Sequence, residues 1–99
     1  MAKKYKVNIS HNAQNDIEHI FYYIAADSTN NAKKFILELS EKIFSLDTFP
    51  ERFAYIPENL YFGTNYRHIT YKKYRVIYKI NNSSVYILRV IHGSKLLDL

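Results

Sequence analysis

The sequence of 99 residues contains no cysteine and no tryptophan, and it has only two glycines and two prolines. The absence of cysteine excludes a disulfide framework, a thiolate metal site and a thiol nucleophile. Two glycines are too few for a glycine-rich phosphate-binding loop. No apolar run approaches the ~18 residues of a membrane span, and the basic start MAKKYKVNIS lacks the apolar run of a signal peptide. We therefore expect a single cytoplasmic domain over residues 1–99, with no membrane segment and no cofactor.

Acidic residues are scarce in the second half of the chain. Residues 1–49 carry six lysines and six acidic residues, whereas residues 50–99 carry eight basic residues against Glu51, Glu58 and Asp98. The whole net charge of +5 therefore lies in the second half. A basic excess confined to one part of a domain indicates an anionic or acidic ligand on one face.

The first half of the chain predicts one strand followed by two helices. Residues 5–9 alternate apolar and polar side chains, which is the pattern of a strand with one buried face. Ser10 or Asn12 can cap a helix that runs to about Ala26, and a second helix continues to about Thr48. Each helix has an apolar stripe, so together they form an antiparallel hairpin whose apolar face must cover a sheet.

The second half predicts an antiparallel sheet. An irregular stretch over residues 50–64 leads into three Tyr-, Val- and Ile-rich strands at about 65–71, 74–80 and 85–91. Their connections are short, so sequential neighbours should pair antiparallel. We therefore predict an α+β domain: an N-terminal strand, an antiparallel helical hairpin and a three-stranded antiparallel β-meander. The helices should lie on one sheet face and leave the other face free.

Cations on the predicted strands are the first candidates for chemistry. Alternation places Arg75 and Lys79 on the free face, where Arg75 can either bind an anion or be a solvated strand cation. Arg67 has the same two interpretations, as a functional cation or as part of a structural ion pair. His92, at a strand end, is either a base or a satisfied histidine.

The acidic and histidine residues of the first half add no further site. Asp16 and Glu18 are two residues apart on a helix, so their side chains diverge. His11 and His19 lack a third ligand at a useful spacing. We therefore expect no metal site.

Five loose motifs follow one another along the chain. They are Ala13-x-x-Asp16-Ile17-x-x-Ile20-x-x-Tyr23-Ile24, Leu46-x-x-Phe49-Pro50, Tyr66-Arg67-x-Ile69, Tyr74-Arg75-Val76-Ile77-Tyr78 and Leu88-Arg89-Val90-Ile91-His92-Gly93. This ordered set resembles the RelE/ParE toxin family over essentially the whole chain. The resemblance implies the RelE-like fold, a role in a microbial type II toxin–antitoxin (plasmid stabilisation) module, and an acidic antitoxin that folds as it wraps the toxin.

The resemblance also implies one of two activities, ribosome-dependent mRNA cleavage (RelE-like) or DNA gyrase poisoning (ParE-like). In RelE-like ribonucleases a cationic cluster stabilises the transition state; Arg75 matches the arginine of the Tyr-Arg-x-x-Tyr strand, and Lys95 stands where a second arginine is placed. The lysine pair of the preceding strand falls here on Tyr66 and His68. The ending at residues 92–95 is similar to the ParE-type His-Gly-Arg-Arg-Asp ending. The sequence therefore favours a growth-inhibiting ParE-like toxin, with a RelE-like endoribonuclease and a degenerate antitoxin-binding protein as alternatives.

These residues and the resemblance give two sets of candidate site residues. The candidate catalytic residues are Arg75, Arg67, Lys95 and His92, and the candidates for binding a nucleic acid or another target are His68, Lys72, Lys73, Lys79 and Arg89.

Overall fold

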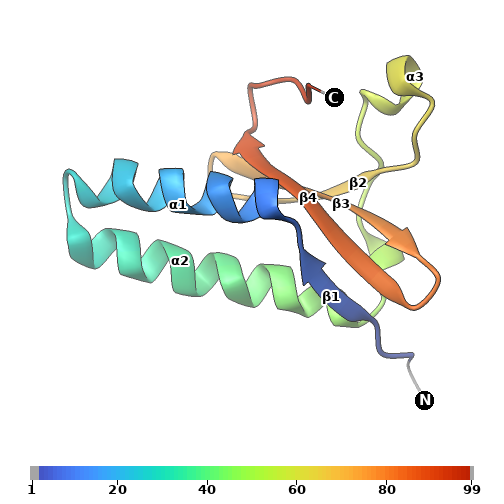
Figure 1. The fold of residues 1–99 in the computed structure, drawn as a ribbon, viewed down its shortest axis with the longest axis horizontal. Helices are drawn as coiled ribbons and strands as arrows, with labels where there is room; N and C mark the ends of the chain where they lie inside the picture. Colours follow the sequence, from blue (N-terminus) through green and yellow to red (C-terminus); the bar gives the residue numbers. More distant parts are fainter. Residues whose placement is uncertain (1–2, 99) are drawn as a thin grey trace.

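The computed structural model describes residues 3–98 and shows a helical hairpin packed against one face of a β-sheet (Figure 1). The elements are β1 (Lys6–Ile9), α1 (His11–Ala25), α2 (Thr29–Phe44), α3 (Asn59–Phe62), β2 (Arg67–Tyr71), β3 (Tyr74–Asn81) and β4 (Ser84–His92), with single-turn 3₁₀ helices at Ser45–Asp47 and Pro50–Arg52. The predicted α+β class, the order of the strands and the two long helices, and the position of that helical hairpin are confirmed. The short α3 and the 3₁₀ turn at Pro50–Arg52 lie in the stretch predicted to be irregular. Within the described residues, no helix combines the length and the apolar composition needed to cross a membrane.

The sheet is mixed, with strand order β1-β4-β3-β2. The pairs β2–β3 and β3–β4 are antiparallel hairpins, as the short connections predict, with Lys72 and Asn82 in the left-handed backbone region of the two turns. β1 lies parallel to β4, with Lys6 opposite Ser84 and Ile9 opposite Ile87. The chain therefore brings its first strand to the edge of its last one, an arrangement that the local sequence pattern does not specify.

Ser10 joins the first helix to the sheet. Its hydroxyl accepts the N–H of Ala13 at 3.1 Å, as an N-cap does, and donates to the carbonyl of Leu88 at 3.1 Å. Leu88 is the extra residue where the β3–β4 register shifts, because Ile77 faces Arg89 while Tyr78 faces Ile87. The cap at Ser10 is thus confirmed over Asn12, and it uses a carbonyl at the irregular point of β4.

The second helix ends earlier than the sequence predicts. It stops at Phe44 rather than near Thr48, and the chain tightens into a 3₁₀ turn. The cause is non-local: the N–H of Tyr5 donates to the carbonyl of Asp47 at 2.8 Å, and Lys4 pairs with Thr48 in an isolated bridge. The carbonyl of Asp47 and the extended backbone of Thr48 are therefore both used by the N-terminal segment, which a continued helix would prevent.

The main core lies between the helices and the sheet. Leu39 and Ile43 of α2 are 1% exposed and pack with Val76, Tyr78 and other apolar sheet residues that are fully buried. The Tyr78 hydroxyl donates to the carbonyl of Pro50 at 2.5 Å, and burial raises the pKa of Tyr78 to about 12. Burying a tyrosine with its hydroxyl satisfied in this way avoids the cost of an unpaired polar group.

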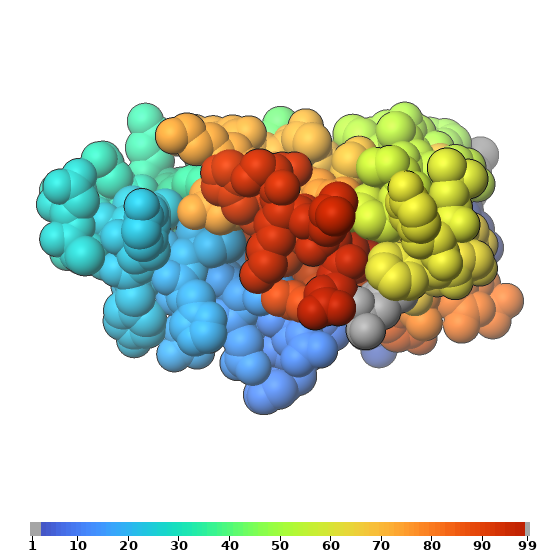
Figure 2. Space-filling model, turned by 90° about the horizontal axis from the view of Figure 1, so that it is seen from above, coloured from blue at the N-terminus to red at the C-terminus, as the bar shows by residue number. Residues whose placement is uncertain are grey.

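The opposite sheet face is not free, contrary to the prediction. Ile56 from the irregular stretch and Leu97 from the C-terminal tail pack on Ile77 and Ile91 in a second, smaller apolar cluster. Figure 2 shows the tail and the α3 segment lying side by side over this part of the molecule. Apolar residues occupy both faces of β3, so the alternation along this strand could not tell an open face from a covered one.

Asp16 of α1 binds directly to the last strand. Its carboxylate accepts from Arg89 Nε at 2.7 Å, from Arg89 Nη2 at 3.0 Å and from the N–H of Val90 at 2.9 Å. The hydrogen bonds and the charge of Asp16 raise the pKa of Arg89. α1 therefore replaces β1 as the neighbour of β4 at the point where β1 has ended.

We predict that Asp16→Ala lowers the free energy of unfolding by about 2–3 kcal/mol, because it leaves a charged guanidinium and a backbone N–H without their acceptor. Glu18→Ala, an exposed change on the same helix, should cost no more than about 0.5 kcal/mol. Urea unfolding followed by circular dichroism measures both. Equal losses would show that the Asp16 contacts add nothing to stability.

Candidate functional site

A buried ion pair connects the sheet to the irregular segment before β2. Arg75 of β3 and Glu58 are 5% and 3% exposed. Arg75 Nη1 donates to Glu58 Oε1 at 3.1 Å, and Arg75 Nη2 donates to Glu58 Oε2. Two parallel hydrogen bonds fix both the distance and the orientation of the two groups. Arg75 does lie on the face opposite the helices, but it is buried and neutralised there.

The C-terminal tail binds to the same two side chains. The N–H of Leu97 donates to Glu58 Oε2 at 2.9 Å, and Arg75 Nη2 donates to the carbonyl of Lys95 at 2.9 Å. We call this set, formed by Glu58, Arg75 and the backbone of residues 95–97, the polar clamp. The hydrogen bonds from Arg75, with that of Leu97, lower the pKa of Glu58 to about 2. The carboxylate is therefore ionised throughout the physiological range.

His68 of β2 lies next to the polar clamp. Its Nδ1 is 3.5 Å from Arg75 Nη1, so the guanidinium can donate weakly to that nitrogen. Burial and the nearby charge of Arg75 lower the pKa of His68 from 6.5. The imidazole is thus mostly neutral at pH 7 and adds no positive charge to this face.

Arg67 and Arg89 are bound to protein groups in the same way. Arg67 Nη1 donates to the carbonyls of Glu51 at 2.9 Å and Phe53 at 2.7 Å. Its Nη2 donates to the Tyr55 hydroxyl at 2.8 Å, and its guanidinium carbon lies 3.9 Å from the centre of that ring. Arg67 thus fixes the segment before α3, and Arg89 fixes α1 through Asp16.

The remaining candidates lie apart from the polar clamp. Lys72 and Lys73 are exposed in the β2–β3 turn, and Lys79 lies 5.7 Å from the Tyr86 ring. His92 is exposed; its Nδ1 accepts from the N–H of Ser94 at 3.2 Å, and its ring packs edge-on against Tyr74. Lys95 is exposed and contributes its carbonyl, not its ammonium, to Arg75. The candidates therefore do not form one cationic cluster.

The sequence interpretation missed the two carboxylates that organise the sheet, Glu58 and Asp16. Glu58 is one of only three acidic residues in the basic half of the chain, and it follows an apolar residue and a proline. That isolation was the available signal, because a lone carboxylate among so many cations is well placed to be paired. Asp16 was noted as a motif residue and as one of two diverging acids, but not as an ion-pair partner, because Arg89 lies 73 residues away.

Above the polar clamp, α3 and the tail expose large apolar side chains. Leu60, Tyr61 and Leu96 are 91%, 86% and 74% exposed, and we call them the α3–tail surface. The segment under them is held firmly: Asn59 Oδ1 accepts the N–H of Tyr66 at 3.0 Å, and Asn59 Nδ2 donates to the Tyr66 carbonyl at 2.9 Å. Exposed apolar groups on a fixed support are typical of surfaces that bind another macromolecule.

Comparison with known proteins places this geometry in context. A family model described as the ParE toxin of the type II toxin–antitoxin system parDE matches residues 7–97. A chain of the chromosomal ParDE TA system from P. aeruginosa is similar in structure, with a TM-score of 0.71 and 16% identity over 90% of this chain and 96% of that one. A chain of the toxin–antitoxin complex RelBE2 from Mycobacterium tuberculosis gives a TM-score of 0.59 and 22% identity over 94% and 95%. At these identities the two structures show the fold alone, and no curated protein matches in sequence.

The pKa of Glu58 predicts a pH dependence of stability. Its folded value of about 2 is below the ordinary 4.5, so the stabilisation is complete above pH 4.5 and is lost as the pH falls through the folded value. A shift of this size is on the order of 3 kcal/mol. We therefore expect the free energy of unfolding to fall steeply between about pH 4.5 and pH 2, measured by urea unfolding at each pH.

The control is Glu58→Gln, which has no carboxylate at this position and should show a shallower fall over the same range. This change leaves Arg75 buried without a counter-ion and should cost about 3–5 kcal/mol at pH 7. If the variant does not fold, the double change Glu58→Leu with Arg75→Leu removes both charges and serves the same purpose. A wild-type curve that parallels these variants would contradict the prediction.

Proposed function

Since the chain belongs to the ParE toxin family of type II toxin–antitoxin systems, we propose that it inhibits growth by binding a target rather than by cleaving RNA. DNA gyrase is the target that resemblance to ParE implies. The observation that supports this proposal is the state of Arg75: the one arginine that matches the RelE-like strand motif is buried and bidentate to Glu58. A guanidinium whose charge is already paired offers little to a developing phosphorane.

The requirements of RNA cleavage also argue against a ribonuclease role for these arginines. A ribonuclease without an acid/base pair depends on donors that are aimed at the charge of the transition state and are free to reach it. Arg75, Arg67 and Arg89 each donate to protein oxygens instead. His68 is neutral and half-buried beside Arg75. The arrangement therefore favours a binding toxin over the RelE-like endoribonuclease.

We further propose a cognate antitoxin as partner, acidic in its toxin-binding segment and folding on contact, with both proteins in the cytoplasm. The basic excess of residues 50–99 supports an acidic partner. A segment that folds on binding can wrap a large surface, at a lower affinity per unit of buried area than a pre-ordered one. The degenerate alternative, a chain that binds its antitoxin and inhibits nothing, is an outcome of the next experiment.

The deciding experiment is inducible expression in bacteria together with assays on the purified protein. We expect growth arrest, accumulation of gyrase-dependent DNA breaks or loss of supercoiling activity, and intact ribosome-bound mRNA. Fragments of ribosome-bound mRNA that appear with the wild type and not with Arg75→Ala would overturn the proposal in favour of the ribonuclease. No growth effect from a folded, abundant protein would support the degenerate alternative.

We place the target contact on the α3–tail surface. Replacing Leu60 and Tyr61 together by serine should weaken target binding about 30-fold or more, because truncation of apolar anchors at a protein interface typically costs at least ~2 kcal/mol. The readout is the protein concentration that gives half-maximal inhibition of gyrase.

The matched control is Tyr22→Ser with Leu37→Ser, two apolar residues of the helices that are 62% and 67% exposed. Both pairs are solvent-exposed, so neither should lower the free energy of unfolding by much more than ~0.5 kcal/mol per residue. Equal inhibition by the two double variants would remove the α3–tail surface from target binding.

A further inference from the structure

Three exposed lysines surround a pocket that the proposed function does not use. The pocket, about 420 Å³ in volume, lies between the helical hairpin and the β2–β3 turn, with Lys34 from α2 and Lys72 and Lys73 from the turn on its rim. The salt bridges formed within residues 3–98 involve other cations, Lys4, Arg75 and Arg89. The three ammonium groups therefore form no ion pair in this part of the chain, and Lys72 makes only an exposed contact with the Tyr71 ring, 5.5 Å from its centre. They can bind a ligand without breaking a salt bridge.

The carboxylate of Glu38 does not cancel this positive potential. Tyr71 donates its hydroxyl proton to Glu38, and that hydrogen bond, followed by the charges of Lys72 and Lys34, lowers the pKa of Glu38. Glu38 contributes one negative charge, already hydrogen-bonded to Tyr71, against the three positive charges of Lys34, Lys72 and Lys73. The rim of the pocket keeps a net positive charge.

The walls of the pocket are mainly apolar and aromatic. Tyr23 and Ile24 of α1, Phe35 of α2 and Tyr74 of β3 line it, with Asn31 as the uncharged polar residue. The Phe35 and Tyr74 rings meet edge to face with centres 5.5 Å apart, so this wall belongs to the packed core. Tyr23 is 78% exposed and can close over a ligand from the solvent side. A volume in this range suits one or two large side chains.

We infer that this pocket binds an acidic segment of a partner protein, with one apolar or aromatic side chain inside and flanking carboxylates on Lys34, Lys72 and Lys73. The charge of the rim selects the carboxylates, and the apolar walls select the anchor. A nucleic-acid strand fits less well, because no arginine is present to grip a phosphate with two hydrogen bonds and little of the wall is polar. The inference rests on the proposed function only for the identity of the partner, the neutralising antitoxin.

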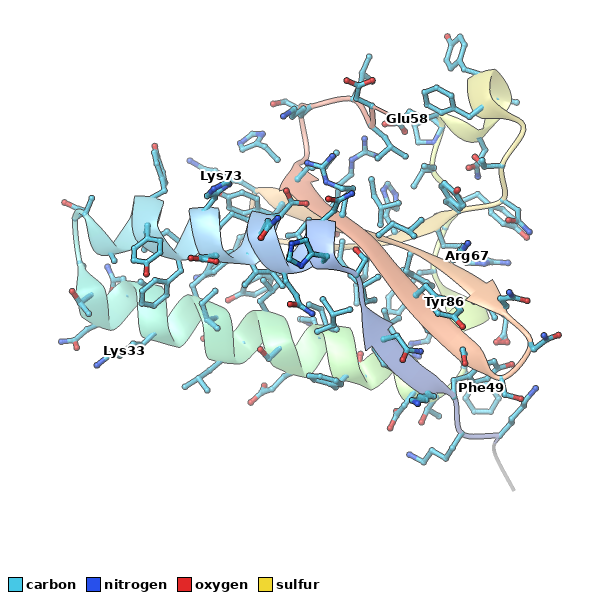
Figure 3. The ribbon with its side chains drawn as sticks, viewed as in Figure 1. Lys33, Phe49, Glu58, Arg67, Lys73 and Tyr86 are labelled. Atoms are coloured by element: carbon cyan, nitrogen blue, oxygen red, sulfur yellow. The ribbon has the colours of Figure 1, made fainter. Side chains whose placement is uncertain are left out.

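The pocket is separate from the α3–tail surface. Figure 3 shows Lys73 over the helical hairpin and Glu58 well away from it beside α3. The same view places Lys33 on the opposite side of the hairpin from Lys73. Lys33 therefore provides a control position on the same helix as Lys34, outside the pocket.

The first test uses the whole chain and no assumption about the partner. A phage library of random dodecapeptides is panned on wild-type protein, with counter-selection on Lys34→Gln/Lys72→Gln/Lys73→Gln. We expect enriched peptides to share an apolar or aromatic residue flanked by at least two acidic residues. Enrichment without acidic residues, or no enrichment over the counter-selected protein, would overturn the inference.

The second test measures the affinity of an enriched peptide by isothermal titration. The triple variant should bind about tenfold more weakly, as three exposed charge pairs at ~0.5 kcal/mol each would give, and Tyr23→Ser should also weaken binding. A control with the same charge change, Lys6→Gln/Lys33→Gln/Lys79→Gln, should stay within about threefold of wild type. Equal losses in the two triple variants would reduce the effect to net charge and overturn the site.

Two further measurements distinguish an acidic-peptide site from a nucleic-acid site, and distinguish failure of this inference from failure of the proposed function. If a single-stranded RNA dodecamer binds more tightly than the selected peptide and loses affinity in the pocket variant alone, the pocket belongs to nucleic acid and the inference is wrong. Growth inhibition by the pocket variant is measured in parallel. A pocket that binds acidic peptide in a chain that does not inhibit growth would sink the proposed function while leaving the pocket's chemistry intact.

Discussion

The buried Glu58–Arg75 pair is the interaction on which the non-helical side of this protein depends. It is the only point within residues 3–98 where β3, the α3 segment and the C-terminal tail share hydrogen bonds to one ion pair. Two apolar residues of similar size can often replace such a pair without loss of stability. Apolar residues, however, do not form directional hydrogen bonds, and these bonds orient the segments that they join. The pair fixes which way α3 and the tail leave the sheet, and therefore where Leu60, Tyr61 and Leu96 are displayed.

Arginine and lysine have divided roles in this chain. All four arginines, Arg52, Arg67, Arg75 and Arg89, donate to protein oxygens. Of the lysines of the basic half, Lys72, Lys73 and Lys95 are exposed and Lys79 is half-buried beside the Tyr86 ring. The planar, multidentate guanidinium suits fixed internal contacts, and the flexible ammonium suits diffuse attraction. The excess positive charge offered to partners is therefore carried by lysine. This division explains why the three strands that each carry an arginine, β2, β3 and β4, do not make a cationic catalytic surface here.

The local patterns of the sequence were sufficient for the elements and their order. The alternation at residues 5–9, the apolar stripes of the two helices and the short connections between the last three strands each act within a few residues, and the structure confirms the elements that they predict. The burial of Arg75 was not, since its partner Glu58 lies 17 residues away in a segment without periodicity. The parallel pairing of β1 with β4 and the Asp16–Arg89 contact are more distant still. Sequence spacing identified Arg75 as a residue of the non-helical face, but only the fold shows what neutralises it.

The pairing of the first strand with the last one affects when this protein can exist as a folded molecule. β1 leaves the ribosome first, yet its hydrogen-bonding partner is the last strand to be made, and Ser10 must wait for Leu88, 78 residues later. Contacts of such long range form late and slowly. During synthesis the chain therefore carries β1 and the helical hairpin before β4, the strand that pairs with β1, and before the tail residues that complete the polar clamp. The order of synthesis therefore delays completion of the sheet, and with it the fixed position of the α3–tail surface, until the last strand and the tail have been made.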